Sequence, residues 1–135
     1  MHKQDKKYLA IWMDNASAHI TEYSTSGTMT TIHLDSASTH QQKTESINKS
    51  ENLMHNKEQH QQSTFYKLLG EKIINFTDVL IFGPSNAKSE LYNLLQEDAR
   101  YSKIIFEVKS ADYMTMPQEH AFIKKHFSNL QDARV

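Results

Sequence analysis

Apolar and polar positions along this chain follow two different periods, which predicts a mixture of strands and helices. The run YLAIWM at residues 8–13 is wholly apolar and stops at Asp14-Asn15, as a strand buried on both faces does before a turn. Residues 18–24 are rich in β-branched and aromatic side chains, and Ser26-Gly27 supplies a turn before the threonine-rich segment 28–34. We therefore expect an antiparallel three-stranded meander.

The second half of the chain alternates helical and strand patterns. Residues 65–73, 87–95 and 115–130 show the spacing of a helix with one buried face. The wholly apolar run VLIF at 79–82 lies between the first two helices, and the segment KIIFEV at 103–108 lies between the last two; both indicate strands. Because strands separated by a helix pair in parallel through a right-handed crossover, we expect the later strands to be parallel.

The last of these helices has a marked beginning. Thr115 and Gln118 have the spacing of a capping box, and Pro117 falls in the first turn.

The predicted fold class is α/β, as one domain over residues 1–135. At 135 residues the chain has the size of an ordinary domain and is too short for two. We expect a single mixed sheet of about five strands, the antiparallel meander followed by parallel crossovers, with three helices packed on it.

Residues 35–62 differ in composition from the rest of the chain. They are rich in Ser, Thr, Asn, Gln, His and Lys, and Ile47, Leu53 and Met54 are their sizeable apolar side chains. Such a stretch buries too little to offset its ordering entropy, so we expect a long, mobile loop whose last residues, KEQHQQ, begin a helix. Loops of this length either carry a function or are tolerated surface insertions, and both interpretations stay open.

Charge and composition exclude several functional classes. The chain has 15 basic and 16 acidic residues, a formal charge of -1, so no global positive field indicates nucleic acid or an anionic membrane. It contains no cysteine and therefore no disulfide or thiolate site. No apolar run approaches a membrane span or a secretory signal, so we expect a cytoplasmic protein without membrane contact.

A family resemblance rests on three segments and on the long polar stretch after the meander. The segments are IWMDNASAHI, DVLIFGPSNAKSEL and KIIFEV. In this order they resemble the central domain of the archaeal and eukaryotic class-I release factors and of Pelota. They look closest to the small stand-alone bacterial relatives called translational machinery proteins. The resemblance covers residues 9–127 and implies a ribonuclease-H-like layer and a task on the ribosome.

One departure from the family restricts that task. In release factors the loop after the third strand carries Gly-Gly-Gln, which assists hydrolysis of the peptidyl-tRNA ester. This chain has no glycine between Gly27 and Gly70, so its glutamine pairs lack the backbone freedom that such a motif requires. Pelota's central domain also lacks the triplet and works on ribosomes. We therefore expect a chain that is not an enzyme and that binds the ribosome or ribosomal RNA.

Alternatives remain for several groups of residues. Gly83-Pro84 before a helix with Lys88 has some features of a phosphate cradle, but a plain strand-to-helix connection is favoured because one glycine and a proline do not make a Walker loop. His33, His40, His55 and His60 lack zinc-ligand spacing, so neither a metal nor another cofactor is expected. A metal-dependent nuclease would use acids near strands, which are Asp14, Glu22, Asp78 and Asp112.

Few residues are candidates for contacting RNA or a protein partner. In residues 35–62 lysines alternate with glutamates, so the local charge cancels. The clusters Lys3, Lys6, Lys7 and Lys124-Lys125 are more typical of a solvated surface. The residues expected to contact RNA or a partner are Lys43, Lys49, Lys57, Asn86 and Lys88. The alternative function from another class is a protein-binding domain that self-associates as a homo-oligomer.

Overall fold

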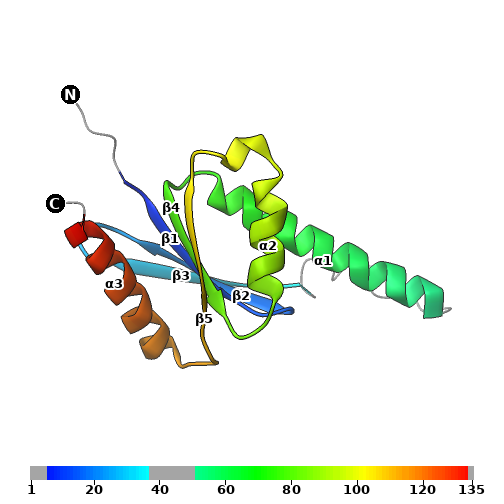
Figure 1. The fold of residues 1–135 in the computed structure, drawn as a ribbon. Coiled ribbons are helices and arrows are strands. Elements are labelled where there is room, and N and C mark those ends of the chain that lie inside the picture. Colours follow the sequence, from blue (N-terminus) through cyan, green and yellow to red (C-terminus); the bar gives the residue numbers. More distant parts are fainter. Residues whose placement is uncertain (1–5, 37–50, 134–135) are drawn as a thin grey trace.

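The computed structural model describes the backbone of residues 6–36 and 51–133 and the side chains of residues 6–36 and 62–130. Its elements, in chain order, are β1 (Tyr8–Met13), β2 (Ser17–Tyr23), β3 (Met29–Asp35), α1 (Glu51–Ile73), β4 (Asp78–Gly83), α2 (Ala87–Gln96), a short 3-10 helix η2 (Ala99–Tyr101), β5 (Ile105–Ser110) and α3 (Met116–Ala133). Figure 1 shows their arrangement.

The five strands form one mixed sheet in the order β3-β2-β1-β4-β5. The pairs β1–β2 and β2–β3 are antiparallel, and the pairs β1–β4 and β4–β5 are parallel. The predicted meander with parallel crossovers is therefore confirmed.

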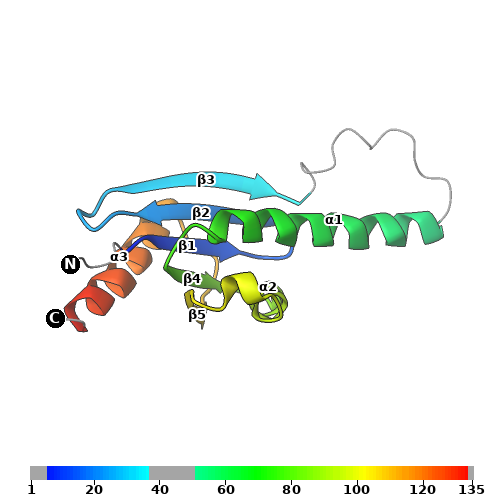
Figure 2. The ribbon, with the colours of Figure 1, turned by 90° about the horizontal axis from the view of Figure 1, so that it is seen from above.

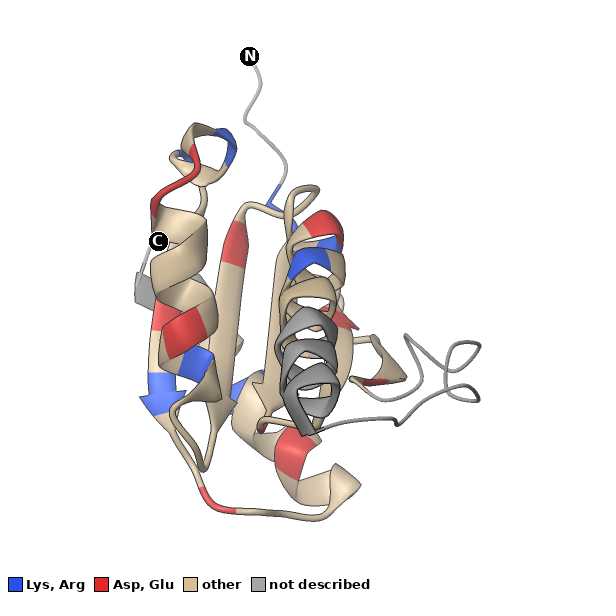
Figure 3. Ribbon diagram, turned by 90° about the vertical axis from the view of Figure 1, so that its right-hand side faces the viewer, with Lys and Arg blue, Asp and Glu red and all other residues tan. Residues whose placement is uncertain are grey.

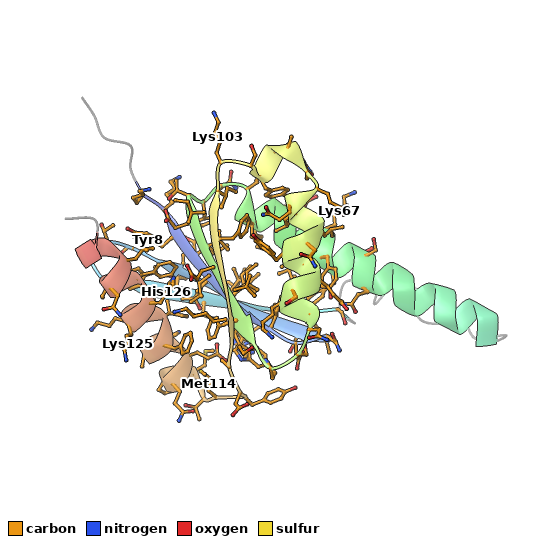
Figure 4. All side chains as sticks on the ribbon, in the orientation of Figure 1. Tyr8, Lys67, Lys103, Met114, Lys125 and His126 are labelled. Carbon is orange, nitrogen blue, oxygen red and sulfur yellow. The ribbon has the colours of Figure 1, made fainter. Side chains whose placement is uncertain are left out.

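Helices cover both faces of the sheet. Figure 2 shows α1 and α2 packed along the sheet, with the amino-terminal part of α1 reaching past the ends of the strands. Leu9, Ile11 and Met13 of β1 belong to the core shared with α1 and α2, whereas Tyr8, Ala10 and Trp12 belong to the core shared with α3. Figure 4 shows Tyr8 between the sheet and α3, where its ring stacks on Phe127 at 4.7 Å between centroids. Because both faces of β1 are covered, its sequence is apolar at every position.

Two predicted boundaries differ from the structure. The helix expected to start within residues 57–62 begins at Glu51, so the predicted loop over 35–62 is too long. Residues 37–50 of that predicted loop lie outside the described residues. The first turns of α1 have too few apolar side chains for a periodic pattern, although Glu, Lys and Gln are good helix formers. The strand predicted at 103–108 is found at Ile105–Ser110, because η2 and a turn take up the preceding residues.

The predicted turn and cap chemistry is confirmed. The backbone N–H groups of Ala16 and Ser17 both donate to Asp14 Oδ1 at 2.9 Å and close the β1–β2 turn. Thr115 N–H donates to Gln118 Oε1 at 2.9 Å, and Gln118 N–H donates to Thr115 Oγ1 at 3.2 Å, so both bonds of the capping box form.

Gly83 ends β4 for a steric reason. Its φ is +156°, and a Cβ added there would lie 2.1 Å from the carbonyl oxygen of Met13 in the neighbouring strand. Only glycine allows the two strand ends to approach this closely. Gly83-Pro84 is therefore a structural connection between β4 and α2.

Candidate functional site

A groove with a volume of about 370 Å³ opens at the end of the sheet where β1 begins. It lies between the amino terminus of β1, the β2–β3 turn and the segment between α1 and β4. A second groove of about 170 Å³ shares Glu22, Thr30, Asn75 and Phe76 with the first and adds Lys72 from the last turn of α1. The two form one surface, which we call the lysine groove.

The lysine groove combines ammonium groups with hydroxyl groups. Lys6, Lys7 and Lys72 supply the positive charges, and Ser24, Thr25, Thr28 and Thr30 supply hydroxyls. Lysines and hydroxyls are the side chains that contact phosphate oxygens of nucleic acids without reading the base sequence. Glu22 also lines the groove and reduces its positive potential.

The three lysines are not equivalent. Lys6 Nζ lies 3.6 Å from Asp78 Oδ1, and the side chain of Asp78 is only 2% exposed. Lys6 therefore partly compensates a buried carboxyl group. All three lysines are exposed, but among the described residues Lys7 and Lys72 have no ion pair, so a polyanion reaches their charges most readily. On the ribbon as a whole, basic and acidic residues are interspersed (Figure 3).

The backbone of Lys7 is fixed to the beginning of β4. Lys7 N–H donates to Thr77 Oγ1 at 2.9 Å, and Thr77 N–H donates to the Lys7 carbonyl oxygen at 2.9 Å. On the other side of the groove, Ser24 N–H donates to the Thr28 carbonyl at 2.9 Å, and Gly27 takes a φ of +100° in that turn. The walls of the groove are thus held by hydrogen-bonded backbone.

A second polar cluster lies between β2, β3 and α3, and we call it the histidine cluster. His19 Nδ1 lies 2.8 Å from Glu119 Oε2, and the His33 ring centroid is 4.4 Å from that of His19. His120 Nε2 lies 2.9 Å from Thr31 Oγ1. His19 and His33 are direct neighbours in the β2–β3 register, which brings them to the same face.

Glu119 is the buried charged member of this cluster, with a side chain that is 1% exposed. Burial raises the pKa of Glu119, and the hydrogen bond and charge of His19 oppose this without reversing it. The ring of Trp12 stacks on His19 at 5.0 Å. Trp12 Nε1 is buried and has no hydrogen-bond partner among the described residues. The cluster ties α3 to the antiparallel half of the sheet.

The corner beside this cluster is closed by Asp14 and Tyr113. The Tyr113 hydroxyl donates to Asp14 Oδ2 at 2.9 Å, although the Tyr113 side chain is largely exposed. Burial acts to raise the pKa of Asp14, but hydrogen bonds from the Ala16 and Ser17 N–H groups and from the Tyr113 and Ser17 hydroxyls outweigh it, and the net pKa is lowered.

The contact residues expected from the sequence do not gather at one place. Asn86 is exposed and precedes α2, so a contact there stays a prediction. Lys88 is 7% exposed, and its Nζ donates to the Ser85 carbonyl at 2.6 Å. Burial and this hydrogen bond leave little of its side chain at the surface, and a contact of Lys88 with a partner stays a prediction. Lys43 and Lys49 lie outside the described residues, and Lys57 lies in α1 with its side chain undescribed.

The acids considered for a nuclease lie at opposite ends of the sheet. Asp14 and Asp112 follow the carboxyl ends of β1 and β5, whereas Asp78 begins β4 and Glu22 lies beside the amino end of β1. Over residues 6–36 and 62–130, no group of three or more acids and histidines is placed to hold a metal ion. These four acids therefore do not form the carboxylate cluster that two-metal catalysis requires.

Sequence reasoning missed the lysine groove and the histidine cluster. Lys72 is 65 positions from Lys7 in the chain, so no local pattern links them. The alternation of side-chain directions along β2 and β3 was a usable signal for His19 and His33, because cross-strand neighbours share a face.

None of the described helices is long and apolar enough to cross a bilayer.

Comparisons with known proteins support the fold. The sequence matches no protein-family model, and no curated protein matches it. The structure is similar to the Pelota protein of Thermoplasma acidophilum, with a TM-score of 0.50 and 14% identity over 85% of this chain and 31% of that one. It is also similar to Pelota of Archaeoglobus fulgidus, with a TM-score of 0.56 and 12% identity over 97% of this chain and 36% of that one.

The chain thus spans about a third of the length of these Pelota proteins. At such low identity the likeness concerns the fold, and on that level the expected release-factor-like and Pelota-like architecture is confirmed.

Proposed function

We propose that this chain is a non-enzymatic translation accessory protein that binds the ribosome or ribosomal RNA. The observation that carries the proposal is the structural likeness to Pelota, which extends over nearly the whole chain. The sequence segments that resemble the release-factor central domain agree with it. On their resemblance we propose further that the chain is a small stand-alone bacterial relative of that domain. A ribosomal partner implies a cytoplasmic location.

The absence of peptide-release activity is part of the proposal. The segment after β3 contains no glycine until Gly70, which lies inside α1. A Gly-Gly-Gln motif needs backbone conformations that other residues rarely adopt. The chain is therefore proposed to occupy a ribosomal or RNA surface without hydrolysing an ester there.

The lysine groove is the proposed RNA contact. Lys7 and Lys72 are exposed, Lys6 adds a partly compensated charge, and the hydroxyls of the β2–β3 turn lie beside them. Each phosphate contact contributes roughly 0.7–0.9 to the slope of log affinity against log salt. Three such contacts predict a roughly 20- to 40-fold loss of affinity between about 50 and 200 mM salt.

Co-sedimentation with purified ribosomes across that salt range tests the proposal. Lys7→Gln with Lys72→Gln should lower the salt slope by roughly 1.4–1.8, because two phosphate contacts are lost. The matched control is Lys103→Gln with Lys125→Gln, two lysines outside the groove that Figure 4 shows extending from the body. Absence of ribosome binding at low salt, or an equal loss in both double variants, would contradict the proposal.

A further inference from the structure

β5 is an edge strand whose outer side is open. The sheet order places β5 at one end, and Figure 1 shows it in front of the sheet with α2 and α3 on either side of it. None of the described elements lies over that outer edge in the view. Glu107 and Lys109 are exposed, and Ile105 is 48% exposed although it is a large apolar residue. An open edge of this kind can pair with another strand.

The hydrogen bonds to β4 determine which backbone groups point outward. Ile105 N–H donates to the Thr77 carbonyl at 3.0 Å, and Ala111 N–H donates to the Gly83 carbonyl at 3.0 Å. Backbone groups alternate sides along a strand, so residues 105, 107, 109 and 111 turn their N–H and C=O groups toward β4. Phe106, Val108 and Ser110 therefore present theirs to the open side.

We propose that β5 pairs antiparallel with β5 of a second copy of this chain, about a two-fold axis at Val108. In that register Val108 faces Val108 of the second copy, and Phe106 faces Ser110 in both directions. Phe106, Val108 and Ser110 are the residues whose backbone groups point outward. They form three cross-strand pairs, and because each pair exchanges two hydrogen bonds, the ladder has about six. The two sheets become one continuous ten-stranded sheet, and the contact is isologous, as in most homodimers.

Charge favours this register over the two with the axis moved by one residue. Glu107 and Lys109 lie on the face covered by α3, where Lys109 Nζ is 6.0 Å from the centroid of the Phe122 ring. With the axis at Val108, Glu107 of each copy faces Lys109 of the other, at a position where cross-strand side chains approach most closely. Moving the axis to residue 107 would oppose two glutamates, and moving it to residue 109 would oppose two lysines. Either shift places like charges together, which destabilises the pairing.

The other edge of the sheet lacks this complementarity. β3 carries a single charged residue, Asp35, at its end, so an antiparallel pair of β3 strands has no opposite charges to match. β5 is therefore the edge whose sequence is complementary to itself. This inference does not depend on the proposed ribosomal role.

Sedimentation equilibrium of the full chain over micromolar to several hundred micromolar concentration tests the inference. Glu107→Lys should weaken dimerisation at least about tenfold, because both cross-strand pairs become like-charged. Lys109→Glu should do the same, and the double variant Glu107→Lys with Lys109→Glu should return to within about threefold of the wild type because the pairs are opposite again. Glu71→Lys, an exposed residue on α1, is the control for the change in net charge.

Val108→Pro tests the backbone hydrogen bonds of the proposed dimer, whereas the charge reversals test its side-chain pairs. Proline removes the outward N–H of Val108 without removing a bond to β4, so the dimer should be lost while the circular dichroism spectrum is kept. If that variant does not fold, the charge-reversal series decides alone. A wild-type chain that is monomeric at several hundred micromolar overturns the inference. A dimer that the single reversals leave unchanged, or that the double reversal does not restore, overturns it as well.

Discussion

His19 of β2 and Glu119 of α3 are 100 positions apart in sequence, yet His19 Nδ1 lies 2.8 Å from Glu119 Oε2. The carboxyl group is almost fully buried and the imidazole is about one quarter exposed, with side-chain exposures of 1% and 23%. A buried carboxyl group is costly unless it has a partner, so this contact stabilises the packing of α3 on the sheet.

The His19–Glu119 contact should give a measurable coupling energy. His19→Ala leaves the Glu119 carboxyl buried without its partner, and we expect a loss of about 1–3 kcal/mol in the free energy of unfolding. In the Glu119→Gln background the same change should cost less, because no buried charge remains. Urea unfolding of the two single variants and the double variant measures the coupling. If the losses of the two single variants add to that of the double variant within about 0.5 kcal/mol, the predicted coupling is contradicted.

Glu119 should also make stability depend on pH. Burial raises its pKa in the folded protein above the ordinary value of 4.5, so the folded state binds this proton more tightly than the unfolded state. The free energy of unfolding should therefore fall as pH rises from 4.5 through the raised pKa, and level off above it. Urea midpoints at a series of pH values should show this slope in the wild type and a smaller one in Glu119→Gln. The charged and titratable neighbours His19, His33 and His120 are common to both proteins.

Tyr113→Phe should raise the pKa of Asp14. The variant loses the hydroxyl that donates to Asp14 Oδ2, while the N–H groups of Ala16 and Ser17 remain, so the pKa should rise toward the ordinary value of 3.8. A lowered pKa gives stability that is lost as pH falls below 3.8 through the folded-state value. That acid loss should therefore be smaller in Tyr113→Phe. A carbon-13 NMR titration of the Asp14 carboxyl group checks the shift, with Tyr92→Phe as the control.

Two glycines with positive φ should tolerate alanine differently. In Gly83→Ala the new Cβ would lie 2.1 Å from the Met13 carbonyl oxygen, so we expect a loss of more than about 2 kcal/mol. Gly27 has a φ of +100° but open space around its Cβ position, so Gly27→Ala should cost about 1 kcal/mol from backbone strain alone. Thermal or urea unfolding compares them. Equal losses would show that the contact with Met13 is not what requires glycine at residue 83.

Much of the fold followed from local patterns in the sequence. The apolar runs of β1 and β4 and the turn at Asp14-Asn15 located these elements correctly, since full burial and turn geometry leave strong signals. The start of α1 at Glu51 was missed because a mostly polar helix has no periodic stripe. β5 was placed two residues early because Ile104 is apolar and packs on the core without belonging to the strand.

The candidate site was less accessible to sequence reasoning. Lys88 was expected to serve a partner, and the structure shows its ammonium group held by the Ser85 carbonyl. The sequence groups Lys7 with other surface lysines and gives no signal for Lys72, whereas in the structure both line one groove. Which surface lysines lie together depends on how the chain returns on itself, and spacing along the sequence does not contain that information.

By itself, the sequence determined the kinds of elements, their order and the mixed pairing of the sheet, because these depend on side-chain periodicity and on turn residues that act over a few positions. Only the tertiary structure decided which polar side chains meet: His19 with Glu119, Tyr113 with Asp14, and the lysines of the groove. Such meetings join residues from different elements. They follow from the packing of α1 and α3 on the sheet, which depends on the shape of the whole core.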